Sequence, residues 1–279
     1  MAPTRHTDPA HPAHPAHPAG PAHPAGPAHP AGPAHPAHPA HPAHPAGPAD
    51  GPDGPDGAFG APLYLQGPEG PWDQAGDRLE ESGHALVCTT WGQWLAAVLL
   101  DPALRPLLGD DWPRFRQTPA AAGRLRLAVS RFVMTYAAAT ALEVPVHTVE
   151  LDHGADGRPA VRAPRAGVEI ALAHCGELIV VGVSRTGPLG VHAEPADRDI
   201  RTLAPPARPW TPQERSVLDA LPGDGRRERL LRLWTLQEAR ARALGPGAAQ
   251  GEPAAGEWSA AAHLVQDRYL VGEAHLLRP

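Results

Sequence analysis

The first 62 residues are built almost entirely from His-Pro-Ala and Gly-Pro-Ala triplets, and this period limits what they can fold into. They contain 18 of the 37 prolines and 10 of the 17 histidines. Proline fixes φ and lacks a backbone donor, so a proline at every third position prevents both helix and sheet. Almost no side chain here could contribute to a core. The pattern therefore predicts a disordered or polyproline-II-like tail over residues 1–62.

The repeated histidines allow two interpretations. In a polyproline helix of three residues per turn, His11, His14 and His17 would lie along one edge and could bind Ni, Cu or Zn weakly. If the chain were a histidine-rich metal-storage protein, its function would depend on this stretch. The alternative is a neutral spacer that arose by slippage of a triplet DNA repeat. Glycine interrupts the series at positions such as Gly20 and Gly26, so we favour the spacer.

The remaining sequence suits one large domain or two small lobes that share a core. Residues 63–83 mix glycine, proline and acidic residues and are predicted to be a linker. The net charge is −6 and all 24 basic residues are arginine, which implies no general affinity for nucleic acid. The pair Cys88 and Cys175 is not a disulfide framework. With no signal core and no apolar run of roughly 18 residues, we expect a cytoplasmic protein without a membrane segment.

Hydrophobic periodicity and turn chemistry predict an α+β fold. Helices are expected over residues 91–108, 124–142 and 226–244, with a shorter one after the capping box Thr211-Pro212-Gln213-Glu214. Strands are expected over residues 84–90, 146–151, 168–172, 178–184, 190–194 and 269–277. This order predicts two similar lobes, 84–185 and 186–279, each with a small antiparallel sheet packed by helices.

Polar residues at two places have spacings that suit metal and phosphate chemistry. Strand alternation puts His192 and Glu194 on the same face. Glu238 and Arg242 are helical neighbours four residues apart. Carboxylate oxygens, waters and phosphate oxygens are what Mg²⁺ prefers. From the spacing alone, a surface ion pair between Glu238 and Arg242 is the favoured interpretation.

Three segments in order resemble the phosphopantetheinyl transferase superfamily, in the pseudodimeric form that serves polyketide and nonribosomal peptide synthetases. They are Leu172–Leu178, Pro188–Pro195 and Leu233–Gly245. The family patterns are roughly (N/S)-x-S-H-S, G-(I/V)-D-(I/V)-E and W-(T/S)-x-K-E-A followed by a basic residue. Upstream, Asp156-Gly157-Arg158-Pro159 resembles the family's G-K-P turn, and Ser130-Arg131 resembles the start of its arginine-led helix.

The resemblance implies an enzyme that transfers the 4′-phosphopantetheine arm of coenzyme A to a serine of an acyl or peptidyl carrier protein, releasing 3′,5′-ADP. Because the attacking hydroxyl comes from the partner, such an enzyme needs no nucleophile of its own. Its catalysis consists of positioning and charge neutralisation at the diphosphate. Mg²⁺ is the implied metal, with Mn²⁺ as an alternative. The implied enzyme is a monomer that binds neither nucleic acid nor membrane.

The resemblance also implies roles for individual residues. His192, Glu194 and Glu238 match metal-binding positions, and Glu238 also matches the base for the carrier serine. Arg242 stands where the family has a lysine near the leaving phosphate, where it can stabilise charge but is a poor proton donor.

Three further residues match positions that bind coenzyme A. His174 matches the histidine that contacts the 3′-phosphate. Arg131 and Arg158 match basic residues that hold the nucleotide phosphates, a task that suits the forked guanidinium group.

Four positions depart from the family patterns. His192 replaces an aspartate, Gln237 replaces a lysine, and Ala173 and Cys175 replace serines around His174. Imidazole is a poorer ligand than carboxylate for Mg²⁺. The chain is therefore either a working transferase or a catalytically impaired homologue that binds coenzyme A or a carrier protein without transfer. Cys175 is interpreted as a small buried side chain rather than a nucleophile.

Overall fold

A computed structural model describes the C-terminal four-fifths of the chain, with short gaps. The described residues are 59–102, 104–154, 156–162, 167–206, 208–245 and 257–277. The predicted tail therefore lies outside them, apart from its last four residues. Phe59 is buried, and its ring packs edge-on against His84 with the centroids 4.6 Å apart. Packed structure thus begins well before the first predicted strand.

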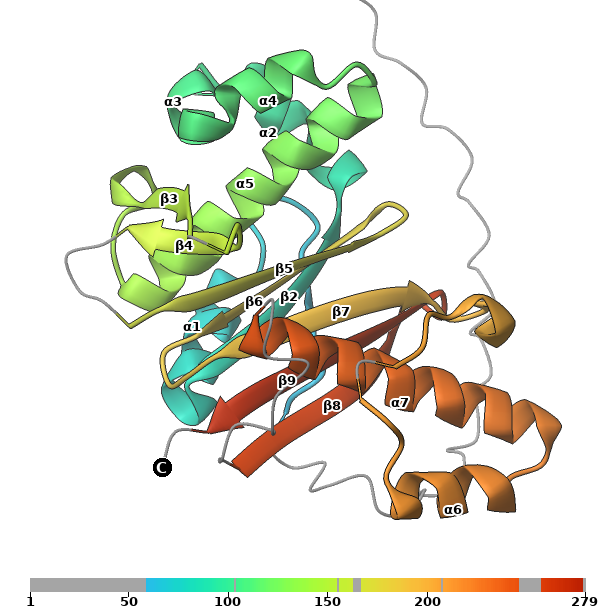
Figure 1. Ribbon diagram of the computed structural model, residues 1–279. Helices are drawn as coiled ribbons and strands as arrows, with labels where there is room; N and C mark the ends of the chain where they lie inside the picture. The colour runs from blue at the N-terminus through green and yellow to red at the C-terminus, as the bar shows by residue number, and fades with distance from the viewer. Residues whose placement is uncertain are drawn as a thin grey trace, which may run out of the picture. The chain divides into compact units, whose positions relative to one another are not determined.

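The described residues form a mixed α+β structure, which confirms the predicted fold class (Figure 1). The strands are β1 (Leu63–Tyr64), β2 (His84–Thr90), β3 (Glu150–His153), β4 (Pro159–Arg162), β5 (Glu169–Cys175), β6 (Leu178–Ser184), β7 (Leu189–Pro195), β8 (Glu257–Val265) and β9 (Tyr269–Leu277). The α-helices are α1 (Trp72–Ser82), α2 (Leu95–Leu100), α3 (Leu104–Leu108), α4 (Trp112–Gln117), α5 (Ala121–Leu142), α6 (Pro212–Ala220) and α7 (Gly223–Leu244). Among them, no helix is long and apolar enough to cross a membrane.

Within the described ranges, two larger sheets pack face to face. One has the strand order β1-β2-β6-β5 and the other β7-β9-β8, while β3 and β4 form a separate hairpin. The contact between the sheets is close, because a Cβ atom on Gly182 of β6 would meet Leu189 at 2.6 Å and Val191 at 3.0 Å. Apolar residues of both sheets share one buried cluster there, which includes Val180 and Val271.

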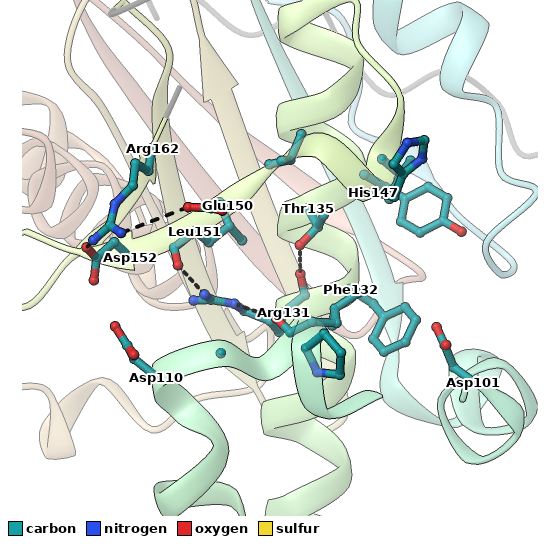
Figure 2. A pocket seen from close by; sticks show the side chains of 16 residues that line it. Asp101, Asp110, Arg131, Phe132, Thr135, His147, Glu150, Leu151, Asp152 and Arg162 are labelled. Carbon is teal, nitrogen blue, oxygen red and sulfur yellow. Dashed lines mark hydrogen bonds and ion pairs between the residues drawn. The ribbon is translucent and has the colours of Figure 1, made fainter. Parts of the chain in front are cut away.

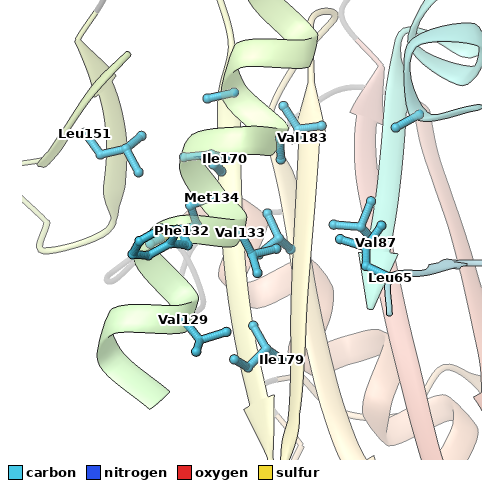
Figure 3. Packing of buried hydrophobic residues seen from close by; sticks show 14 of the residues in the cluster. Leu65, Val87, Val129, Phe132, Val133, Met134, Leu151, Ile170, Ile179 and Val183 are labelled. Atoms are coloured by element: carbon cyan, nitrogen blue, oxygen red, sulfur yellow. The ribbon is translucent and has the colours of Figure 1, made fainter. Parts of the chain in front are cut away.

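Each sheet has helices on its other face. Figure 3 shows α5 side chains such as Val129 and Val133 packed against the sheet at Ile179 and Val183 of β6. On the second sheet, α7 lies almost in backbone contact with β7. A Cβ atom on Gly190 would meet the Ala239 carbonyl oxygen at 2.0 Å.

Part of the element order occurs in both halves of the described residues. In the first half, β2 comes before the long helix α5 and the hairpin β5–β6, with other helices and strands between them, and the last strand lies in the middle of β2-β6-β5. In the second half, β7 comes before the long helix α7 and the hairpin β8–β9, with α6 between β7 and α7, and β9 lies in the middle. The pairings within each set are antiparallel. Both central helices have 22 residues.

The stretch 63–83 is not a linker, contrary to the sequence-based prediction. It contains β1 and α1, and Leu65 and Leu79 are buried in the main core. Helix α1 has few apolar residues, but Ala75 and Leu79 are four apart and therefore share one buried face. Gly83, with φ of 75°, ends this helix in a left-handed conformation that favours glycine.

Two other predicted elements differ in extent. Residues 146–148 form a 3₁₀ turn, so the strand expected over 146–151 begins only at Glu150. The helix expected over 91–108 is divided into a 3₁₀ turn and two short helices. Strand β8 had no counterpart among the predicted elements.

Candidate functional site

The outward face of β7 carries two of the predicted site residues. Gly190, His192 and Glu194 alternate on the side that faces α7, as the strand pattern predicts. Nε2 of His192 lies 3.2 Å from Oε1 of Glu194 and donates a hydrogen bond to it. The His192 ring packs edge-on against Trp234 of α7, 5.1 Å between centroids. This hydrogen bond lowers the pKa of Glu194, against the opposing effect of partial burial.

Arg242 brings a cation to the same face of β7. Its guanidinium donates to the carbonyl of Val191 at 3.0 Å. Burial lowers the pKa of Arg242, and the carboxylates of Glu238 and Glu194, in that order, act in the opposite direction. Both carboxylates therefore lie within electrostatic reach of one guanidinium.

Arg158 attaches the β3–β4 turn to the end of α7. Its guanidinium donates to the main-chain carbonyls of Arg242 at 2.6 Å and Ala243 at 3.2 Å. Its Nε donates to Asp156 at 2.7 Å, and this bond holds the guanidinium in place. The predicted turn is thus part of the same region, although 84 residues separate Arg158 from Arg242.

His174 stands near the end of β5, on the face toward α5. Its Nε2 lies 2.7 Å from the hydroxyl of Ser130. The pKa of His174 is lowered to about 4, first by desolvation and then by the positive charges of Arg126, Arg114 and Arg242. These guanidinium groups come from α5, α4 and α7. Such a concentration of positive charge at an exposed histidine suits an anion.

Five predicted site residues are therefore gathered in one region, where β5 and β7 lie alongside each other and α7 ends. They are Arg158, His174, Glu194, Glu238 and Arg242. Arg242 connects them, because its charge acts on His174, the charges of both carboxylates act on its guanidinium, and its carbonyl oxygen accepts a hydrogen bond from Arg158.

Arg131, by contrast, is buried and bonded to partners outside this group. It is 4% exposed and donates to Asp111 at 3.2 Å and to the carbonyls of Leu107, at 3.2 Å, and Leu151. Figure 2 shows it among the residues that line a separate cavity of about 590 Å³, beside the Arg162–Asp152 ion pair. Its predicted role with nucleotide phosphates remains a prediction.

Cys175 lies on the opposite face of β5 from His174, in the cluster between the two sheets. Burial, followed by the charge of Glu194, raises its pKa to about 11. A thiol of that pKa is protonated near neutral pH, which agrees with a packing role and not with a nucleophile.

The donors predicted for a metal are near one another without forming a coordination shell. Within the described ranges, no group of three or more histidine, cysteine, aspartate or glutamate side chains could hold an ion. His192 and Glu194 are bonded to each other, and Arg242 is near Glu194 and Glu238. The carboxylates have the chemistry that Mg²⁺ requires, whereas the imidazole of His192 suits softer metals.

Arg126 was missed by the sequence analysis. Its Nε is buried and lacks a hydrogen-bond partner in the described part of the chain. It lies four residues before Ser130, so the two share a face of α5. The available signal was this one-turn spacing, since Ser130 had already been singled out as part of a family-like segment.

Comparison of the sequence with protein-family models and with curated proteins finds no match to either. The arrangement of the side chains is therefore the basis for interpreting the site.

Proposed function

We propose that this chain is a phosphopantetheinyl transferase that modifies a serine of an acyl or peptidyl carrier protein, using coenzyme A and releasing 3′,5′-ADP. We expect it to act as a monomer in the cytoplasm. The observation that carries the proposal is the convergence of Arg158, His174, Glu194, Glu238 and Arg242. They come from separate segments whose order along the chain resembles that family.

The repeated order of elements supports the same proposal. A strand, a long helix and a hairpin occur twice, and the last strand is central both times. We interpret this as a pseudodimer of two lobes, 84–185 and 186–279. Residues of the candidate site come from both lobes, since His174 belongs to the first and Arg242 to the second.

In the proposed reaction, the carrier serine oxygen bonds to the β-phosphorus of coenzyme A while the bond to the leaving 3′,5′-ADP breaks. Glu238, half-buried and near Arg242, accepts the serine proton directly or through water. Arg242 offsets the charge that develops on the leaving phosphate. His174 and Arg126 hold the 3′-phosphate, and Arg158 fixes the turn beside the end of α7.

A divalent ion, Mg²⁺ or Mn²⁺, belongs to the proposal. When bound, it would neutralise the charge of the diphosphate. Glu194 and Glu238 are the residues that would hold it, together with water and phosphate oxygens. His192 is the third proposed donor, and Nδ1, which has no hydrogen-bond partner among the described residues while Nε2 donates to Glu194, is the nitrogen that would bind the ion.

A second candidate function is binding of coenzyme A or a carrier protein without transfer. The hydrogen bond between His192 and Glu194 favours this second function, because the two side chains are paired with each other at the place where the family has two carboxylates.

The two candidates are separated by one experiment. The full chain is incubated with coenzyme A, Mg²⁺ or Mn²⁺ and a panel of apo carrier proteins, which are then weighed by mass spectrometry. A gain of the phosphopantetheine mass supports the transferase and should vanish in Glu238→Gln. The matched control is Glu228→Gln, an exposed position of the same helix paired with Arg232. Coenzyme A binding with no mass gain on any carrier would instead support the second function.

A further inference from the structure

The hydroxyl of Ser130 determines which nitrogen of His174 carries hydrogen. Ser130 is buried, and its Oγ donates to the main-chain carbonyl of Arg126 at 2.7 Å. A hydroxyl has one hydrogen to donate. Toward His174, 2.7 Å away, Oγ can therefore only accept, and Nε2 of His174 must be protonated. In the neutral ring the hydrogen is then on Nε2, and Nδ1 is left without one.

The charges that face His174 are positive. The charges that act on the pKa of His174 are those of Arg126 from α5, the helix that also carries Ser130, Arg114 from α4 and Arg242 from α7. Arg114 is close to Asp111, at 4.0 Å, whereas Arg126 has no ion-pair partner in the part of the chain that the structure describes. These cations and the partial desolvation of the ring keep His174 neutral near pH 7.

A neutral His174 of this tautomer cannot donate to an anion, because its only N–H is given to Ser130. A phosphate dianion beside the ring changes this in two ways. Its charge offsets the guanidinium groups, and it accepts a hydrogen bond that only the protonated ring can give from Nδ1.

We propose that a phosphate monoester dianion binds beside Arg126 and His174 together with one proton, taken from solvent and held on Nδ1 of His174, and that Ser130 is the positioning residue that keeps Nε2 protonated. In this binding reaction the protein, one phosphate dianion and one H⁺ combine to give a complex in which the ring of His174 is an imidazolium. The inference rests on the proposed function only in identifying the monoester as the 3′-phosphate of coenzyme A.

The experiment is calorimetric titration of the full chain with 3′,5′-ADP at pH 7.5, in two buffers of different ionisation enthalpy. The phosphate is already mostly dianionic there, since its second pKa is about 6. The difference in heat gives the number of protons taken up. We expect uptake of a substantial fraction of one proton by the wild type and none by His174→Gln, with weaker binding. Inorganic phosphate serves as a second probe without the nucleoside.

Ring nitrogen NMR shifts of ¹⁵N-histidine-labelled protein report the tautomer directly. The free wild type should show Nε2–H for His174, Ser130→Ala should lose this preference, and Ser130→Thr should restore it. A purely structural role of Ser130 would lower the melting temperature without changing the tautomer.

An Nδ1–H tautomer in the free protein, binding of 3′,5′-ADP without proton uptake, or no binding of either probe would each overturn the inference. Failure of the proposed function looks different. Proton-linked binding with no transfer to any carrier protein would reject the proposed transferase function and support the proton-linked phosphate site. Transfer to a carrier protein without proton uptake on binding would support the transferase function and reject the proton-linked site.

Discussion

The guanidinium of Arg158 donates a hydrogen bond to the main-chain carbonyl of Arg242 at 2.6 Å, which joins the β3–β4 turn to the end of α7. The last turn of a helix leaves carbonyl groups without helical partners, and a cation there also interacts favourably with the helix dipole. The contact therefore stabilises the end of α7 and keeps a turn from the first half beside a helix of the second.

Substituting Arg158→Ala should lower the free energy of unfolding by about 1 kcal/mol, the net contribution of a hydrogen bond. It should also weaken binding of 3′,5′-ADP, because the turn is no longer held beside the site. Urea denaturation and calorimetric titration measure the two effects. The matched control is Arg162→Ala on the neighbouring β4, where the side chain is 65% exposed in its ion pair with Asp152. Equal effects of the two substitutions would contradict this account.

Gly190 is the closest point of approach between β7 and α7. A methyl group there would lie 2.0 Å from the Ala239 carbonyl oxygen and 2.4 Å from the Ala243 nitrogen, so α7 would have to move away from the sheet. We expect Gly190→Ala to destabilise the fold by about 3 kcal/mol or more, as overpacking does, and to abolish transfer. Urea denaturation checks this, with Gly223→Ala as the control.

Gly223 is the first residue of α7, and a methyl group there meets nothing within 4 Å. Its substitution should leave stability unchanged or slightly raised, because alanine has less conformational freedom in the unfolded chain. A similar loss of stability in both variants would show that the contact at Gly190 is not the cause.

The parts of the fold that could be predicted are those with strong periodicity or clear end signals. Helix α7 ends at Gly245 as expected, the Thr211 capping box begins α6, and β9 has its predicted bounds. Strand β8 was missed because its run of alanine and serine, Ser259–Ala262, has neither alternation nor β-branched residues. Its strand conformation depends on pairing with β9, which is tertiary information.

From the sequence, the candidate site could be predicted only for residues whose own helix or strand determines which way the side chain points. Strand alternation placed His192 and Glu194 on one face, which the structure confirms. Arg126 and Arg131 are five positions apart on α5, so their side chains point in directions about 140° apart around the helix axis. Which of them faces His174 depends on how α5 packs against β5. The sequence patterns singled out Arg131 for the nucleotide phosphates and passed over Arg126, whose charge acts on His174.

Stability should fall as the pH is lowered from about 6.5 to about 4, in part because of His275. This side chain is 1% exposed and lies 3.0 Å from the Ser184 hydroxyl. Burial and then the charge of His84 lower the pKa of His275 to about 4, whereas an unfolded histidine has a pKa of about 6.5. Between these values the unfolded chain binds the extra proton and the folded chain does not, so acid favours unfolding.

Urea denaturation of the wild type between pH 7.5 and pH 4.5 measures this effect, and His275→Gln should have a shallower slope of stability against pH in that window. The control is His147→Gln, at an exposed position. An unchanged slope in the His275 variant would show that other groups carry the pH dependence.

Arg126→Gln should lower the affinity for 3′,5′-ADP about tenfold to a hundredfold, corresponding to the loss of one hydrogen bond to a charged group. The reason is that, of the three positive charges that lower the pKa of His174, that of Arg126 has the largest effect, and Arg126 has no ion-pair partner among the described residues. Titration calorimetry measures the change. Arg116→Gln on α4, an exposed arginine, is the control and should bind as the wild type does. Equal losses in both variants would reveal a diffuse electrostatic effect instead of a binding site.

His192→Asp tests whether the histidine is what limits a divalent metal at β7. The substitution replaces the hydrogen bond to Glu194 with two neighbouring carboxylates in a buried place, where like charges repel and each is partly desolvated. The variant should therefore melt at a lower temperature than the wild type in the absence of metal. Mg²⁺ should reverse this loss, because two carboxylates can share a hard cation. The rise in melting temperature with Mg²⁺ should be larger in the variant than in the wild type, and transfer to a carrier protein should be faster.

His192→Asn is the matched control, since it has nearly the same shape without the charge and should gain neither effect. If Mg²⁺ stabilises the aspartate and asparagine variants equally, Glu194 and its neighbour at position 192 do not form the metal site.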